Sequence, residues 1–247
     1  MNGDVGIPLI QTHQLQRNYG RGDATVAGLA GIDLAIHRGE MVALMGPSGS
    51  GKSTLMQILG LLDRPTSGNY RLSGSDISTL SGSQQAELRG RRIGFVFQGI
   101  HLLPRLSAIQ NVELPMVYAR FSASERKALA RQSLARVGLS HLANRRPTQL
   151  SGGQAQRIAI ARAVAPGPDL LLADEPTGAL DRASGRAVLA LFQHLNADLG
   201  LTIVLVTHDS FVGRHAQRIV ELEDGRIVAD HLVEDRIPPE QLMEVDV

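Results

Sequence analysis

Four short stretches of the sequence are apolar at nearly every position, and they limit the folds that this chain can adopt. They are residues 41–45, 93–97, 170–174 and 202–207. A strand with one face in water alternates apolar and polar residues, whereas continuous apolar runs are typical of parallel strands buried on both faces. Because three of the four lead into helical or turn patterns, the chain is predicted to be an α/β protein.

The overall composition excludes several classes of protein. With 43% hydrophobic residues, the 247-residue chain can bury a large core. The 25 Lys and Arg residues nearly balance the 24 Asp and Glu residues, so we expect no nucleic-acid partner. There is no cysteine, no secretory signal and no apolar run of the roughly 20 residues that a membrane span needs. A reducing, cytoplasmic setting is therefore expected.

The remaining segments suggest how the chain is organised. Residues 9–17 and 32–37 have strand character, and residues 226–230 suggest one last short strand. Between residues 106 and 142 the strand signal gives way to helical periods rich in Ala, Arg and Leu, with Ser122 or Ser124 as a candidate helix cap. We therefore expect an inserted helical subdomain there.

A glycine-rich loop follows the first apolar strand and leads into a helical pattern. Glycines in this setting let the backbone approach phosphates closely, a lysine reaches the terminal phosphates, and a serine hydroxyl can bind Mg²⁺. Only two of the 25 basic residues are lysines, and one of them lies here. A flexible turn is the weaker alternative. The predicted ATP-binding residues are Gly46, Pro47, Ser48, Gly49, Ser50, Gly51, Lys52, Ser53 and Thr54.

Polar side chains follow the other apolar strands. Asp174 and Glu175 end one strand, Gln98 follows another and His208 a third. The carboxyl ends of parallel strands share one sheet edge, where α/β proteins bind ligands, so these groups are expected to converge near Lys52. Asp174 would hold Mg²⁺ through water, and Glu175 would polarise an attacking water. Each residue alone could equally be an ordinary turn residue.

Two further features remain open on residue evidence alone. Ser151, Gly152, Gly153 and Gln154 stand at the start of an apolar helical period. They could be an ordinary helix cap or a second anion-binding helix start. Tyr19, in a chain with 3% aromatic residues, could stack on a purine ring or simply fill space.

Taken together and in this order, these motifs resemble the ATP-binding subunit of ABC transporters over roughly residues 9–230. The resemblance implies a P-loop NTPase fold with a mixed or parallel core sheet, an N-terminal antiparallel β subdomain and an inserted α-helical subdomain. The expected parts of this single domain are the core with its β subdomain (about 7–97 and 165–232), the helical subdomain (about 98–164) and a tail (233–247).

The same resemblance implies roles for individual residues. Two chains would form a homodimer on binding ATP, with each nucleotide held between the loop of one chain and Ser151 to Gln154 and Asp181 of the other. Tyr19 would stack on adenine. Gln98, Glu175 and His208 would be catalytic, with Glu175 as the general base. The implied Mg²⁺ ligands are Ser53, Gln98 and Asp174.

Four stretches resemble the macrolide-exporter and lipoprotein-releasing branch of the family, namely residues 43–70, 91–98, 102–119 and 170–181. That branch implies ATP-driven export, an integral membrane permease, a periplasmic adaptor, and a peripheral location on the cytoplasmic face of the inner membrane. Because the sequence stops at Val247, a subunit separate from its permease is expected. The alternatives are an importer ATPase, a soluble nucleic-acid-associated ATPase and a subunit that binds ATP without hydrolysing it.

Overall fold

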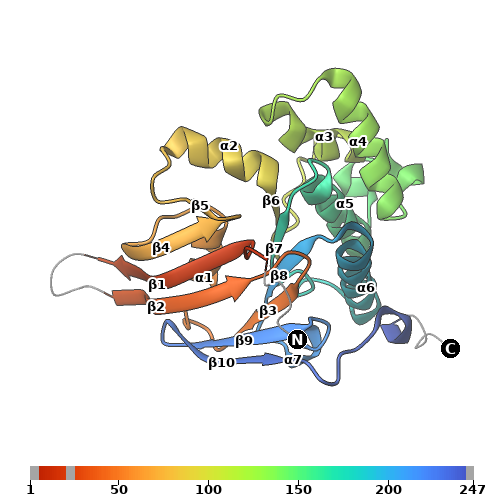
Figure 1. Cartoon of the computed structure of the whole chain (residues 1–247). Coiled ribbons are helices and arrows are strands. Elements are labelled where there is room, and N and C mark those ends of the chain that lie inside the picture. Colours follow the sequence, from red (N-terminus) through yellow and green to blue (C-terminus); the bar gives the residue numbers. More distant parts are fainter. Residues whose placement is uncertain (1–5, 21–25, 243–247) are drawn as a thin grey trace. The chain divides into compact units, whose positions relative to one another are not determined.

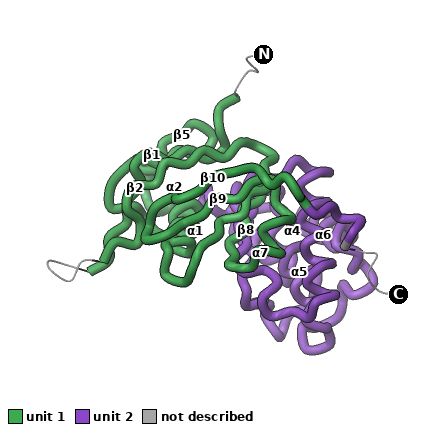
Figure 2. The backbone as a smooth tube through the Cα atoms, turned by 90° about the horizontal axis from the view of Figure 1, so that it is seen from below, with its two compact units in different colours: residues 1–86, 202–236 green, residues 87–201, 237–247 purple. Residues whose placement is uncertain are grey.

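The computed structural model describes residues 6–20 and 26–242, and within it the chain divides into two compact units. Unit 1 contains residues 1–86 and 202–236, and unit 2 contains residues 87–201 and 237–247 (Figure 2). The subdomain boundaries expected from the sequence follow a different division of the chain and stay a prediction. Of the expected tail, residues 243–247 lie outside the described residues.

Unit 1 begins with an antiparallel sheet in the order β2-β1-β4-β5 (Figure 1). Its strands are β1 (Ile10–Tyr19), β2 (Val26–Ile36), β4 (Ser67–Leu72) and β5 (Ser75–Asp76). The predicted antiparallel β subdomain is therefore confirmed. Strand β2 begins at Val26 rather than at residue 32, because pairing with β1 extends it through a Gly- and Ala-rich stretch with little propensity of its own.

A second set of strands in unit 1 is centred on β3 (Met41–Met45). This strand pairs in parallel with β8 (Thr202–Val206) on one side and with β9 (Arg218–Glu223) on the other. Strand β9 pairs antiparallel with β10 (Arg226–Leu232), which makes the sheet mixed, as predicted. All five residues of β8 are buried, and so are the first four of β3, as their continuous apolar character indicates.

Two helices in unit 1 follow these strands. Helix α1 (Lys52–Leu59) comes directly after the glycine-rich loop and buries Leu55, Met56, Ile58 and Leu59. The short helix α7 (Ser210–Gly213) follows β8, with Asp209 as its N-cap. Both helices therefore begin where a parallel strand has ended, as in other α/β proteins.

Unit 2 contains a parallel strand pair and a long helix. Strand β6 (Ile93–Val96) pairs with β7 (Leu170–Asp174), from Ile93 opposite Leu170 to Val96 opposite Ala173. Helix α2 (Gly82–Arg92), which begins in unit 1, leads into β6, and α6 (Arg182–Leu199) follows β7. The buried side of α6 includes Val188, Leu189, Phe192 and Leu195. The short helix η4 (Pro239–Leu242) packs against α6.

The helical part of unit 2 consists of α3 (Ala108–Tyr118), α4 (Ala123–Arg136) and α5 (Gly152–Val164), with two short 3₁₀ turns, η2 (Ser140–Leu142) and η3 (Pro147–Gln149) (Figure 1). The predicted helical insertion is therefore present. Each α-helix begins with a capping box, at Ser107, Ser122 and Ser151 respectively. Of the two candidate caps for α4, the structure selects Ser122. Val112, Met116, Leu134 and Ile158 are among the residues that form the apolar core between these helices.

The buried histidine of unit 1 predicts a pH-dependent stability. Nδ1 of His215 lies 2.7 Å from the carbonyl oxygen of Phe211, so this nitrogen carries the proton and donates it. Burial lowers the pKa of His215, and the charges of Arg214 and Arg236 lower it further. The unfolded chain therefore binds the extra proton more readily than the folded chain does. The neutral imidazole of His215 stabilises the fold fully above the unfolded pKa, and this stability is lost as the pH falls from that value through the lower folded pKa.

We expect the melting temperature to fall between about pH 7.5 and about pH 5.5, either side of the usual histidine pKa of about 6.5. A His215→Met variant should show a weaker dependence over the same range, because no imidazole is left to charge in the unfolded chain. Thermal unfolding monitored by circular dichroism measures both profiles. Identical slopes for the two proteins would contradict this explanation.

Candidate functional site

The glycine-rich loop of unit 1 joins the end of β3 to the start of α1. Two of its glycines are required by their surroundings as well as by their backbone angles, φ 144° at Gly46 and 102° at Gly51. A Cβ on Gly46 would lie 2.1 Å from the carbonyl oxygen of Leu222, and one on Gly51 would lie 2.5 Å from that of Gly28. No other residue type fits these two positions, so the loop conformation depends on glycine.

Lys52 lies over this loop at the first position of α1. Its Nζ donates hydrogen bonds of 2.7 Å each to the carbonyl oxygens of Gly46 and Pro47. The start of α1 has no side-chain cap and no acidic residue in its first turn. Backbone N–H groups and the positive end of the helix dipole therefore combine with the ammonium group, an arrangement that suits a phosphate. Ser53, on the same turn, is exposed to solvent.

Tyr19 lies at the end of β1 and beside α1. Its Oη is 3.4 Å from Oγ1 of Thr54 and 3.4 Å from a carboxylate oxygen of Asp63. A Cβ on Gly28 would lie 2.7 Å from the ring, so the small residue at this position leaves room for it. The guanidinium of Arg17, 4.7 Å from the ring centroid, was not predicted, although the two-residue spacing on one strand face is a signal for such a contact.

His208 follows β8 in unit 1. Strands β3 and β8 are parallel neighbours, and the backbone N–H of Thr207 donates to the carbonyl oxygen of Leu44 at 3.1 Å. The glycine-rich loop and His208 therefore leave the sheet at the same edge. His208 is exposed. Its neighbour Asp209 accepts a hydrogen bond from the backbone N–H of Phe211 at 2.8 Å and so caps α7.

The second group of predicted residues lies in unit 2, after β6 and β7. These strands run parallel and end side by side, which places Gln98 and the pair Asp174 and Glu175 beyond the same edge. Glu175 has a φ of 43°, a strained conformation for a residue other than glycine and one that is common at functional sites. A Cβ on Gly178 would lie 3.1 Å from Nε2 of Gln98, so the amide of Gln98 lies against the turn that Glu175 begins.

The start of α5 is capped by its own residues. The N–H of Gln154 donates to Oγ of Ser151 at 3.2 Å, and the N–H of Ser151 donates to Oε1 of Gln154 at 3.0 Å. A Cβ on Gly153 would lie 2.6 Å from Oγ of Ser184, so the first turn of α5 packs closely against the first turn of α6. The sequence left two readings open, an ordinary helix cap and an anion-binding helix start, and the structure shows a cap. The contact with ATP from a second chain stays a prediction.

Asp181 caps α6 in the same part of unit 2. Its carboxylate accepts a hydrogen bond of 2.9 Å from the backbone N–H of Ser184. This bond, together with the hydroxyl of Ser184, holds the pKa of Asp181 below its usual value. Asp181 is therefore charged at neutral pH and lies beside the start of α5.

The predicted residues thus form two groups, one in each unit. Unit 1 holds Tyr19, the loop Gly46 to Thr54, and His208. Unit 2 holds Gln98, Ser151 to Gln154, Asp174, Glu175 and Asp181. In the part of the chain that the structure describes, no three His, Asp or Glu side chains gather in a way that could hold a metal ion. The predicted Mg²⁺ ligands include only one carboxylate, that of Asp174.

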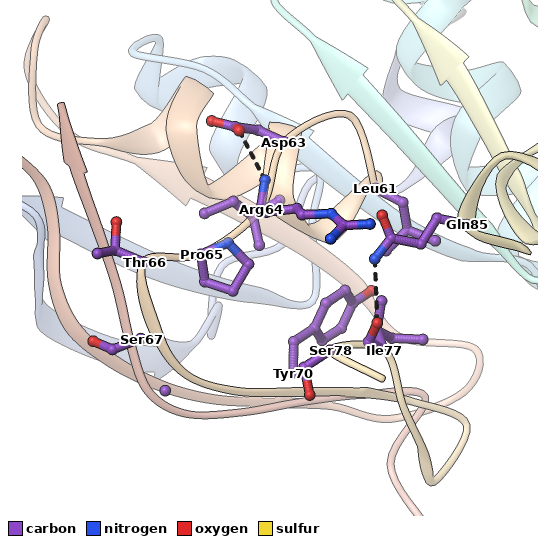
Figure 3. Close-up of a pocket in the computed structure, with 12 residues that line it drawn as sticks. Leu61, Asp63, Arg64, Pro65, Thr66, Ser67, Tyr70, Ile77, Ser78 and Gln85 are labelled. Atoms are coloured by element: carbon purple, nitrogen blue, oxygen red, sulfur yellow. Dashed lines mark hydrogen bonds between the residues drawn. The ribbon is translucent and has the colours of Figure 1, made fainter. Parts of the chain in front are cut away.

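Unit 1 also contains a cavity of about 250 Å³ (Figure 3). Its walls come from the end of α1, from β4 and from the segment that leads to α2, and they include Leu61, Arg64, Tyr70 and Gln85. Gln85 donates to the carbonyl oxygen of Ile77 at 3.2 Å. None of the predicted ATP-binding residues lines this cavity.

The glycine-rich loop between a buried parallel strand and a helix, with a lysine at the helix start, defines a nucleotide-binding protein of the P-loop class. The chain belongs to the ABC transporter family, whose model matches residues 29–178. This membership confirms the family resemblance, the fold class and the predicted class of enzyme, an ATPase.

Solved structures of ATP-binding cassettes have the same fold. A dimeric post-hydrolysis state of the cassette MJ0796, bound to ADP and Pi, matches with a TM-score of 0.82 and 40% identity, covering 91% of this chain and 99% of that one. The protein CbiO1 from Clostridium perfringens, part of the ABC transporter complex CbiONQ, matches with a TM-score of 0.83 and 29% identity, covering 95% and 90% of the two chains.

Among named relatives, the macrolide export ATP-binding/permease protein MacB of Rhodopseudomonas palustris (strain HaA2) is 53% identical over 223 residues, which is 90% of this chain. The pyoverdine export ATP-binding/permease protein PvdT of Pseudomonas aeruginosa is 50% identical over 236 residues. The chain spans about a third of the length of these relatives, 34% and 35% respectively. Among the described residues, no helix combines the length and the apolar character that a membrane span requires.

Proposed function

We propose that this chain binds ATP on the loop Gly46 to Thr54 and hydrolyses it with Glu175 as the general base. The observation that carries the proposal is the position of Lys52, whose ammonium lies over a glycine loop at an uncapped helix start. A triphosphate is the ligand whose charge and shape this arrangement suits best. Gln98 and His208 would contact the attacking water and the γ-phosphate, and Tyr19 would stack on adenine.

The residues present also fit a magnesium ion held together with the nucleotide. Mg²⁺ prefers oxygen ligands and usually keeps several waters, so one hydroxyl, one amide oxygen and one carboxylate are a suitable set. Ser53, Gln98 and Asp174 supply those three groups. When bound, the ion would neutralise charge on the phosphate oxygens. The exposed hydroxyl of Ser53, on the first turn of α1, supports this assignment.

The active form is proposed to be a homodimer in which each ATP also contacts Ser151 to Gln154 and Asp181 of the second chain. Ser151 and Gly152 are exposed at the start of α5, where backbone N–H groups can face an anion. The dimeric state of the cassette MJ0796, bound to ADP and Pi, supports the formation of a dimer. Hydrolysis would replace an attractive contact by separate, mutually repelling products, and the dimer would open.

The proposed biological role is ATP-driven export. The supporting relatives are named export ATP-binding/permease proteins. The cassette would lie at the cytoplasmic face of the inner membrane and drive the movement of an integral membrane permease. A periplasmic adaptor protein would be a further part of the transporter complex. In this role the alternating closure and opening of the dimer supplies the movement.

The dependence of activity on protein concentration tests this proposal. If each site needs residues from two chains, the rate of ATP hydrolysis per chain should fall steeply as the protein is diluted below the dissociation constant of the dimer. Phosphate release measured over a dilution series at saturating ATP checks the expectation. A constant rate per chain, in samples that light scattering shows to be monomeric, would refute the shared site.

A further inference from the structure

Gln156 is a buried glutamine on α5 that lies outside the predicted site residues. It is 1% exposed and lies two residues after Gln154. Its Nε2 donates a hydrogen bond of 2.8 Å to the carbonyl oxygen of Pro176 and a longer one, of 3.5 Å, to that of Phe97. Flipping the amide would turn its oxygen toward two other oxygens, so the contacts themselves determine its orientation.

The two carbonyl groups that Gln156 contacts stand next to the two predicted catalytic side chains of unit 2. Phe97 directly precedes Gln98, and Pro176 directly follows Glu175. A single NH₂ group therefore bridges the loop after β6 and the loop after β7. The amide of Gln98 also lies against Gly178, and the N–H of Gly178 donates to the carbonyl oxygen of Glu175 at 3.1 Å.

The glutamine at this position has a stabilising half and a destabilising half, its NH₂ group and its oxygen respectively. Within the described part of the chain, Oε1 of Gln156 is buried without a hydrogen-bond partner. A buried acceptor without a partner destabilises the folded state and so offsets part of what the hydrogen bonds of Nε2 to the two carbonyl oxygens contribute. Ala155, directly before it, and Ile158, two residues after it, are apolar and buried, so α5 buries apolar side chains on both sides of it.

We propose that Gln156 is a positioning residue, which holds the carbonyl groups of Phe97 and Pro176 at a set spacing and thereby aligns Gln98 with Glu175 for hydrolysis. The proposal rests on the proposed function, which assigns the roles of those two side chains. It also gives α5 a second task. The helix begins at the predicted contact with the second chain's ATP. Gln156 lies two residues beyond that contact, so a shift of α5 would move the loops after β6 and β7 through its hydrogen bonds.

Three variants of the full chain test this role. Gln156→Met keeps a similar length but has no donor. Gln156→Glu keeps a donor to Pro176 only while its carboxyl is protonated. Gln193→Met is the matched control, because Gln193 is also a buried glutamine of unit 2, 2% exposed, and its Nε2 donates to a backbone carbonyl, that of Ile237, at 2.8 Å.

The expected result is a loss of kcat without a matching change in nucleotide affinity. Gln156→Met should lower kcat by about 10-fold or more, since small displacements of reacting groups have effects of that size or larger. The KM for ATP and the affinity for a fluorescent ATP analogue should stay close to wild type. Gln193→Met should keep kcat while losing a similar amount of thermal stability.

The Gln156→Glu variant adds a second measurement, the pH dependence of kcat, which a purely structural role of Gln156 would leave unchanged. Its kcat relative to wild type should be highest at the acidic end of the profile and should decline as the carboxyl ionises and faces two carbonyl oxygens. The proposal is overturned if Gln156→Met retains the kcat of Gln193→Met, or if Gln156→Glu follows the wild-type pH profile. A Glu175→Gln variant measured in parallel distinguishes a failure of the proposed function from a failure of the positioning role alone. Its full turnover would refute the proposed function itself, whereas its inactivity beside an active Gln156→Met would refute only the positioning role.

Discussion

Replacement of Glu175 by glutamine is expected to abolish ATP turnover while ATP binding and the ATP-dependent dimer remain. The amide has the size and shape of the carboxylate but cannot accept a proton from the attacking water. General-base catalysis typically contributes a factor of about 100 to about 10,000, so kcat should fall by at least about 100-fold. Phosphate release gives kcat, and size-exclusion chromatography with and without ATP gives the dimer.

The trapped dimer is the more specific part of this expectation. If hydrolysis opens the dimer, a variant that binds ATP but does not cleave it should accumulate in the closed state. Glu87→Gln is a suitable control, because Glu87 is exposed on α2 and outside the predicted site. Near-normal turnover in Glu175→Gln would show that another group acts as the base.

Replacement of Lys52 by alanine is expected to weaken ATP binding itself. A hydrogen bond to a charged group is worth about 1.5–3 kcal/mol, so the affinity for ATP should fall about 10- to 100-fold. Lys52→Arg should restore little of it, because a planar guanidinium does not fit where Nζ lies 2.7 Å from two carbonyl oxygens. Isothermal titration calorimetry with ATP measures both variants.

The chain offers an unusually clean control for this experiment. Lys127 is the other lysine of the sequence and is exposed on α4. Lys127→Ala removes the same charge from the same chain and should leave the affinity unchanged. Equal losses in the two alanine variants would mean that net charge, rather than the phosphate loop, governs nucleotide binding. Together, Lys52→Ala and Glu175→Gln separate binding from hydrolysis.

Much of the fold could be predicted because its signals are local. Apolar runs identified β3, β6, β7 and β8, since a strand buried on both faces needs no partner to be recognised. The start of β2 could not be predicted, because Val26 to Gly31 is held in the strand by contacts with distant residues, chiefly its pairing with β1. The sequence likewise allowed either Ser122 or Ser124 to cap α4, and only the folded helix shows that Ser122 is the N-cap.

The candidate site shows the same division. The glycine loop and Glu175 were predicted because phosphate chemistry requires particular residues at particular spacings, and the role of the start of α5 was predicted from the family resemblance. The guanidinium over Tyr19 and the amide of Gln156 between two loops were not, because these contacts depend on which elements the folded chain brings together.

From the sequence alone came the family, the fold class and the phosphate loop, because glycines, a lysine and apolar periods act through the local backbone. Only the tertiary structure decided that a Cβ at Gly46 would collide with Leu222, that Gln98 lies against Gly178, and that Gln156 reaches both Phe97 and Pro176. Such contacts join residues that are far apart along the chain, and their geometry exists only after the strands and helices have packed.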